Sequence, residues 1–453
     1  MTDTKHRFRN RKIVTLALKL LAMGLTAYAI SIYLNIFVSN YLTSELYGDF
    51  TVTLRSLNLI STVLLLGSNF VSVKYLSKYI SNKKNEHVTC FIDWNFKLIF
   101  KTSTLCIILS LVLFLTIYIL HVLNIKDLYS YHYVTYTLWL APFSGLVLLL
   151  SSYILSTKKG KLFFAMSQIA QNLFLLIIFC VAIFFFDMNL KYSSILITIF
   201  IVLLLIITIE SISLSDIFTS YIKIRKTVTL KAQPNWMQDS LKFIFANILY
   251  TTMCATDLYI IEIFHTNEAS VGHYSAILVI GSLLIVTIPK ATCTILKPKI
   301  TTMISNNRHK ELNELTLFVI FINFLSLTPI LLGIIFFSKT ILSLFGTGYS
   351  SAHIPLIITS ISYYMSGMLQ PYSILLFYTN ATKGIKIDIL QLLITICLGI
   401  PFTYLWGLLG ISISVATALS VSILCKYIIA KKEMERQQQN YNSTYALCSK
   451  SSC

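Results

Sequence analysis

The feature that most constrains this chain is a series of long apolar segments separated by short polar connections. A bilayer-spanning helix needs about 20 apolar residues. Because every backbone polar group in the hydrocarbon must be satisfied internally, helices are the simplest structures for such segments. The sequence therefore predicts an all-α integral membrane protein with about twelve transmembrane helices. The segments are approximately 14–38, 47–76, 97–123, 132–155, 161–187, 191–214, 238–263, 271–297, 313–338, 351–379, 384–406 and 408–431.

Lysine and arginine are distributed unevenly over the connections between these segments. One alternate set of connections, together with the two chain ends, carries most of the basic residues, while the other set contains only Lys126, Lys191 and Lys339. Cytoplasmic loops carry an excess of Lys and Arg, so both termini are predicted to be cytoplasmic. The net charge of +18 follows from this orientation, and we expect no nucleic-acid partner.

Charged residues make up 12% of the chain, about half the share in soluble domains. The connections predicted to face outward are short and leave no room for a soluble catalytic domain. The sequence shows no phosphate-binding glycine loop, no metal-ligand cluster and no nucleophile–base pair in a recognisable spacing. We therefore expect a protein that is not an enzyme and has no catalytic or metal-binding residues.

The longest basic connection divides the chain into two halves of six predicted helices each. We expect an N-terminal lobe over 1–214, a cytoplasmic linker over 215–237, a C-terminal lobe over 238–431 and a cytoplasmic tail over 432–453. Because each half has an even number of helices, the two repeats would run in the same direction through the membrane.

A short internal similarity supports this duplication. The segment T-S-E-L-Y-G-D-F-T over 43–51 follows the first predicted helix, and T-N-E-A-S-V-G-H-Y-S over 266–275 follows the seventh. With one inserted residue, a threonine, a glutamate, a glycine, an aromatic residue and a hydroxyl residue align. We interpret both segments as the corner that starts a lobe, with Gly272 marking the second turn.

Arg55 is an ionisable residue inside an apolar segment, which is costly and indicates function by default. Thr51, Asn58 and Thr62 lie on the same helical face because they are spaced one or two turns from it. Two interpretations remain open. Arg55 either lines a hydrated cavity or pairs with a helix-end carbonyl or with another helix.

Two lysines also lie inside predicted spans. Lys290 follows Pro289, whose ring loosens a helix, and Lys19 lies in the first span. Both are near the cytoplasmic side, where a long side chain can extend to the interface. They either face the interior or reach the membrane surface in this way.

The main acidic residue within a span is Asp257, which could be an interhelical anchor, a ligand of a coupling cation or a salt-bridge partner. Glu210 and Asp388 lie near cytoplasmic helix ends and are expected to be interfacial. The cations Arg55, Lys290 and Lys19 outnumber the acids, so a cavity between the lobes would be positive. This favours an anionic passenger such as a lipid-linked phosphate or pyrophosphate.

Four short motifs occur in a recognisable order. They are Leu46–Phe50; Asp257 followed by an apolar run and V-G-H-Y-S-A over 271–276; Ile341–Gly346 with Tyr349; and Gly407–Ser414. Together they resemble the polysaccharide-biosynthesis, O-antigen-type flippases of the multidrug/oligosaccharidyl-lipid/polysaccharide (MOP) exporter superfamily. The chain departs from that pattern in lacking a basic residue directly after Asp257 and in having Ser412 and Ser414 where alanines are usual.

The resemblance implies two six-helix lobes around a V-shaped central cavity, as in multidrug transporters of the MATE type. It implies a flippase of the bacterial inner (plasma) membrane that moves an undecaprenyl-pyrophosphate-linked oligosaccharide by alternating access, for O-antigen and lipopolysaccharide synthesis. Arg55, Lys290, Lys19 and Asn58 would bind the substrate. Asp257 would bind a coupling H⁺ or Na⁺ or lock one lobe state, and no other cofactor is expected. Partners would be membrane lipids, a polysaccharide polymerase and glycosyltransferases.

Three other functions are compatible with a protein of many spans, and one of them is a membrane scaffold that transports nothing. A multidrug or cation antiporter of the same fold commonly has its coupling acid in the first helix, where this chain has Lys19. A polysaccharide polymerase would be expected to have a sizeable outer loop bearing arginines, which this chain lacks. The flippase is therefore the favoured interpretation.

Overall fold

The structure, a computed structural model, describes residues 2–123, 132–157, 162, 165–186, 192–224, 235–264, 269–289, 292–293, 300, 303 and 308–451. Some helix residues within these ranges, including 2–21 and 437–451, are described by their backbone only. All regular secondary structure in the described ranges is helical, which confirms the all-α class.

The described chain forms two compact units, which we name unit 1 (Met1–Glu45 and Thr256–Cys453) and unit 2 (Leu46–Ala255). The first helix therefore belongs with the second half of the chain, and the boundaries fall inside helices α2 and α10. The two compact units do not coincide with the two halves of the internal repeat. The lobe boundaries expected at 1–214 and 238–431 therefore stay a prediction.

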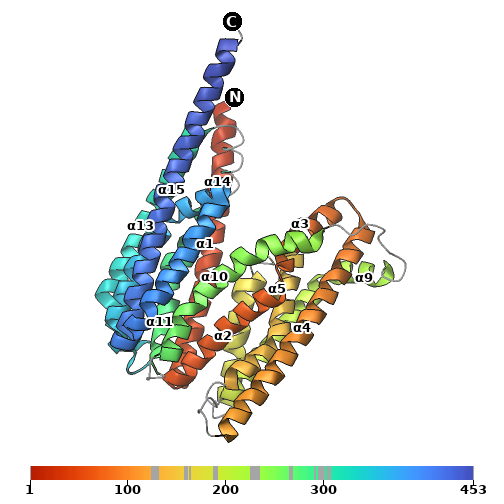
Figure 1. Cartoon of the computed structure of the whole chain (residues 1–453), viewed down its shortest axis with the longest axis vertical. Helices are drawn as coiled ribbons and strands as arrows, with labels where there is room; N and C mark the ends of the chain where they lie inside the picture. The colour runs from red at the N-terminus through yellow and green to blue at the C-terminus, as the bar shows by residue number, and fades with distance from the viewer. Residues whose placement is uncertain are drawn as a thin grey trace. The chain divides into compact units, whose positions relative to one another are not determined.

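Unit 2 consists of helices that lie alongside one another (Figure 1). Helix α5 packs against α3, α4 and α8, while α7 packs on α8. The elements are α2 (Ser44–Leu64), α3 (Ser68–Ser81), α4 (Asn85–Val122), α5 (His132–Ser156), the π-helix η2 (Ala165–Ala170), α7 (Gln171–Phe186), α8 (Tyr192–Ser213), α9 (Ser215–Ile224) and the first part of α10 (Trp236–Phe264).

In unit 1, α14 packs on α13 and α15, and α1 packs on α11 and η3. The start of α1 and the end of α15 lie at the same end of this unit (Figure 1), which is compatible with an even number of spans. The elements, besides the last part of α10, are α1 (Thr2–Tyr41), α11 (Ala269–Ser282), the π-helix η3 (Leu283–Thr287), α13 (His309–Ser343), the 3₁₀ turn η4 (Tyr349–Ala352), α14 (His353–Trp406) and α15 (Leu408–Ser451).

One predicted span is not a single straight helix. The segment 47–76 is broken into α2 and α3, which meet at 57°. Leu66 and Gly67 make this bend with positive φ values of 47° and 78°. A side chain on Gly67 would place its Cβ 2.4 Å from the carbonyl oxygen of Ser240, so only glycine allows α10 to pass this closely.

Helix α14 has 54 residues, which is far more than the roughly 20 needed to cross a bilayer. It contains one non-helical residue, Asn380, with φ −154° and ψ 77°. Nine described helices are long and apolar enough to cross a membrane, and α7 is a shorter apolar helix. If the bent pair α2–α3, α7 and the two halves of α14 each count as a span, the described helices are compatible with the twelve predicted.

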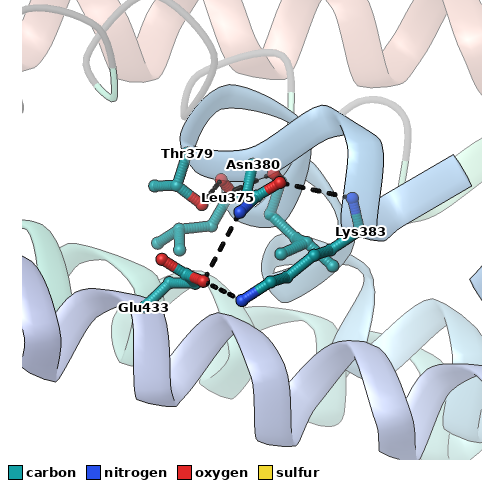
Figure 2. Close-up of polar contacts among 6 residues, drawn as sticks. Leu375, Thr379, Asn380, Lys383 and Glu433 are labelled. Atoms are coloured by element: carbon teal, nitrogen blue, oxygen red, sulfur yellow. Dashed lines mark hydrogen bonds and ion pairs between the residues drawn. The ribbon is translucent and has the colours of Figure 1, made fainter. Parts of the chain in front are cut away.

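The turn at Asn380 is held by polar contacts to α15 (Figure 2). The Asn380 side-chain oxygen accepts from the backbone N–H of Lys383 at 3.3 Å, and the Lys383 ammonium lies 2.5 Å from Glu433. Further along the same two helices, Lys426 pairs with Asp388 at 2.6 Å. These contacts join the second half of α14 to α15.

Small residues let α14 and α15 approach closely, which is how helices associate without a hydrophobic driving force in lipid. Ser412 and Ser414 are fully buried, and the Ser414 hydroxyl donates to the carbonyl of Thr395 at 3.1 Å. A Cβ on Gly410 would lie 1.9 Å from the carbonyl oxygen of Phe402. The serines that depart from the family pattern thus occupy interhelical packing positions.

Candidate functional site

Arg55 lies in the middle of α2 in unit 2, and its side chain is half-buried. Its Nη1 donates to the backbone carbonyl of Cys254 on α10 at 3.2 Å. This is the only hydrogen bond that the described residues give it, so other N–H groups of the guanidinium have no protein acceptor there. The structure therefore shows the interhelical contact that was one of two interpretations, and lining of a cavity between the lobes stays a prediction.

The polar residues that share a helical face with Arg55 differ in how exposed their side chains are. Thr51 and Thr62 are buried, and each hydroxyl bonds a backbone carbonyl one turn earlier, those of Tyr47 and Asn58. The Asn58 side chain, in contrast, is exposed. The hydrogen bonds of the two threonine hydroxyls are thus made within α2. On this face, Arg55 and Asn58 are the residues whose polar groups could bind a ligand.

Two predicted substrate-binding residues cannot be placed. Lys290 lies outside the described residues, and Lys19 is described by its backbone within α1 only. Their predicted contribution to a cationic cavity therefore stays a prediction.

Asp257 lies on α10 in unit 1 and is buried, with 6% of its surface exposed. One carboxylate oxygen accepts from the Tyr274 hydroxyl on α11 at 3.2 Å, and the other accepts from the backbone N–H of Leu258 at 2.9 Å. These contacts make Asp257 a link across the α10–α11 hairpin. They fit the interhelical anchor that was one of its three interpretations, and its predicted role in cation coupling stays untested.

The two internally similar corners meet in unit 1. A Cβ on Gly272 would lie 2.0 Å from the backbone oxygen of Ser44 at the start of α2. The prediction that Gly272 marks a turn is wrong, because Gly272 lies inside α11. Its missing side chain instead permits close packing of α11 against the first corner.

Other motif residues gather at the same place. Asn40 on α1 donates to the carbonyl of Leu344 at 2.7 Å, and the His273 ring packs edge-on against Tyr349 with centroids 4.7 Å apart. Gly346 and Gly348 turn the chain here with φ values of 130° and 100°. This corner of unit 1 is tightly packed, so its motif residues are explained by structure rather than by ligand binding.

A second buried acid was not recognised as such from the sequence. Glu210 on α8 is fully buried, although its position near a helix end predicted an interfacial side chain. Its Oε1 accepts from the Ser151 hydroxyl on α5 at 2.5 Å, and its Oε2 has no hydrogen-bond partner among the described residues. The available signal was an acid within the apolar run of α8, but Ser151 is far away in sequence.

The part of the chain that the structure describes contains no cluster of metal-ligating side chains. No group of three or more His, Cys, Asp and Glu side chains there is placed to hold an ion. The polar chemistry of the described spans is therefore that of separate charged and hydrogen-bonding groups, Arg55, Asp257 and Glu210 among them.

The comparisons with solved structures identify the fold. An inward-facing multidrug resistance MATE family transporter of the MOP superfamily is similar over 93% of this chain and 99% of its own, with 14% identity and a TM-score of 0.67. The lipid II flippase MurJ, in an inward closed conformation, is similar over 93% and 90%, with 16% identity and a TM-score of 0.65. A MOP superfamily transporter from Pyrococcus furiosus is similar over 94% and 96%, with 12% identity and a TM-score of 0.61.

The sequence comparison reaches the same group. The comparison with curated proteins finds no significant match. The sequence profile of the family described as "Polysaccharide biosynthesis protein" matches residues 16–293, which is more than half of the chain. The chain therefore belongs to the polysaccharide biosynthesis protein family and has the fold of the MOP superfamily transporters.

Proposed function

We propose that the protein is a flippase for a lipid-linked oligosaccharide repeat unit. The passenger would be carried on undecaprenyl pyrophosphate across the bacterial inner membrane, and the product would serve surface polysaccharide synthesis, such as that of O-antigen. Family membership supports polysaccharide biosynthesis, and the shared fold supports transport rather than catalysis.

The proposal that the passenger is an anion rests on Arg55. An arginine within an apolar helix is costly unless its charge is used, and the described residues give it only one acceptor. A guanidinium offers several donors in a planar arrangement that matches phosphate. Arg55, together with Lys290, Lys19 and Asn58, would hold the diphosphate and the adjoining sugar, while the lipid tail stays in the bilayer.

Asp257 would act at a different stage of the cycle. Its bonds to Tyr274 and Leu258 join α10 to α11, and a coupling H⁺ or Na⁺ that competed for this carboxylate would loosen the link. Asp257 thus either binds the coupling cation or locks one state of the protein. Glycosyltransferases that build the repeat unit and a polymerase that uses it would be the protein's functional partners.

The test is flipping of a fluorescent lipid-linked oligosaccharide in proteoliposomes. A charge-assisted hydrogen bond is worth roughly 1.5–3 kcal/mol, so Arg55→Ala should slow flipping by about tenfold to a hundredfold. Arg55→Lys should keep part of the rate because it keeps the charge. Lys84→Ala, at an exposed lysine between α3 and α4, is the matched control and should behave as the unmodified protein.

Two outcomes would count against the proposal. Full flipping by Arg55→Ala would remove the main support for an anionic passenger. Transport of cationic dyes that does not depend on Arg55 would favour a multidrug antiporter of the same fold.

A further inference from the structure

Glu210 is a buried acid to which neither the family nor the proposed substrate path assigns a role. It lies in the last turn of α8, three residues before the helix ends at Ser213, and none of its surface is exposed. Its only hydrogen-bond partner among the described residues is the Ser151 hydroxyl of α5, at 2.5 Å from Oε1. The other oxygen, Oε2, is buried without a partner in the same part of the chain.

No described cation lies beside Glu210 to balance a negative charge. Helix α8 packs on α5 and α7. Titratable side chains on these two helices include Tyr153 and Cys180, and those on α9, which follows α8 directly, include Asp216, Tyr221 and Lys223. Ser151 is the one described group that forms a hydrogen bond with Glu210.

These surroundings disfavour the carboxylate ion. An ionised group in an apolar interior costs far more than a neutral polar group unless a counter-charge or several donors stabilise it. The negative end of the α8 dipole adds repulsion, because Glu210 lies in the last turn. A neutral carboxylic acid needs only its contact with Ser151 and leaves one uncharged oxygen unpaired.

We propose that Glu210 is a proton-binding site within unit 2. The acid holds its proton while α5 and α8 enclose it. When these helices admit water, the O–H bond breaks, the proton passes to water and the carboxylate is solvated. A hard cation would require several oxygen ligands, and here the described residues offer only the carboxyl group and one hydroxyl, so a proton fits the site better.

The proton site extends the proposed function. Only the use of the proton in transport rests on that function. A flippase that alternates between two states can couple to a proton gradient if one state encloses a protonated acid and another exposes it. Glu210 would supply this coupling within unit 2, separately from Asp257 in unit 1.

The presence of the proton is tested by infrared spectroscopy of the purified protein at neutral pH. We expect a C=O stretching band of a protonated carboxylic acid that disappears in Glu210→Gln. The band should remain in Asp388→Asn, the matched control, because Asp388 is ion-paired with Lys426. An unchanged band in Glu210→Gln would overturn the proposal. If that variant fails to fold, Ser151→Ala serves instead, and it should shift the band by removing the hydrogen bond; an unshifted band would overturn the assignment.

The use of the proton is tested in proteoliposomes with an imposed pH gradient. Flipping by the unmodified protein should respond to the gradient, and flipping by Glu210→Gln should not. A response that persists in Glu210→Gln would overturn the coupling role. If the infrared band depends on Glu210 but no lipid-linked oligosaccharide moves in the unmodified protein, the proton site stands and the flippase assignment fails.

Discussion

Asp257 in unit 1 and Glu210 in unit 2 are both carboxylic acids buried within apolar helices, but their hydrogen bonding differs. Each oxygen of Asp257 accepts a bond, one from Tyr274 and one from the backbone of Leu258. Glu210 accepts one bond from Ser151 and keeps an oxygen without a described partner. Burial is therefore similar, and the number of donors is not.

The difference indicates two different roles. Donors to both oxygens satisfy Asp257, and its bond to α11 makes it a structural link. A single neutral donor at a helix C-terminus favours a protonated Glu210, which can change its charge when water reaches it. Charge alone in an apolar segment does not identify the residue that takes part in a transport cycle.

The largest predicted effect tests whether α11 is held rigidly enough to anchor Asp257. Gly272→Leu should push α11 away from Ser44, because even a Cβ would lie 2.0 Å from the Ser44 oxygen. Tyr274 would move with the helix. We expect a loss of about 3 kcal/mol or more in the free energy of unfolding, measured as a lower thermal midpoint or a failure to accumulate.

Gly333→Leu on α13 is the control, because nothing lies within 4 Å of a Cβ at that position. It should cost little beyond any change in helix propensity. Equal tolerance of leucine at both positions would mean that α11 and the start of α2 are not closely packed.

The next largest effect should come from removing the anchored acid. Asp257→Ala deletes the acceptor for the Tyr274 hydroxyl, which is buried, and a bond to a charged group is worth roughly 1.5–3 kcal/mol. We expect a decrease of that size in the free energy of unfolding, measured by thermal unfolding in detergent. Asp257→Asn keeps one acceptor oxygen and should cost less. A stable alanine variant would show that Asp257 is not an anchor.

The sequence was informative about spans and about isolated charges. Apolar length and the uneven distribution of lysine and arginine predicted a helical membrane protein, and Arg55 and Asp257 were visible because they interrupt apolar runs. The break at Leu66 and Gly67 was not visible, since it depends on the approach of Ser240 from α10. Long-range backbone contacts of this kind leave no local pattern.

Gly272 and Glu210 show the same limit. A glycine at a helix start has the same sequence pattern whether it turns the chain or permits a close contact with Ser44. Similarly, an acid near a helix end is interfacial or buried depending on what packs over it. For Glu210 that neighbour is α5, whose Ser151 lies far away in the chain.

A smaller effect is expected when the acid of unit 1 is kept and one donor is removed. Tyr274→Phe deletes the hydroxyl that donates to Asp257 at 3.2 Å but preserves the ring packing. A single hydrogen bond contributes about 1 kcal/mol net, so the thermal midpoint should fall by less than in Asp257→Ala. An equal fall in both variants would mean that this bond accounts for the whole effect of the acid.

The smallest effect is predicted at Glu210, and its sign gives the sharpest contrast with Asp257. Leucine has a similar size and removes both the unpartnered oxygen and the ionisable group. It leaves the Ser151 hydroxyl without its acceptor, which costs roughly 1–3 kcal/mol. Removal of the unpartnered Glu210 oxygen offsets this cost, so Glu210→Leu should change the free energy of unfolding by about 1 kcal/mol. Adding Ser151→Ala removes that hydroxyl as well, and the double variant should be at least as stable as the unmodified protein in thermal unfolding. A large loss of stability in the double variant would show that Glu210 is a structural anchor like Asp257, because a carboxyl group that serves only to bind a proton contributes little to holding α5 and α8 together.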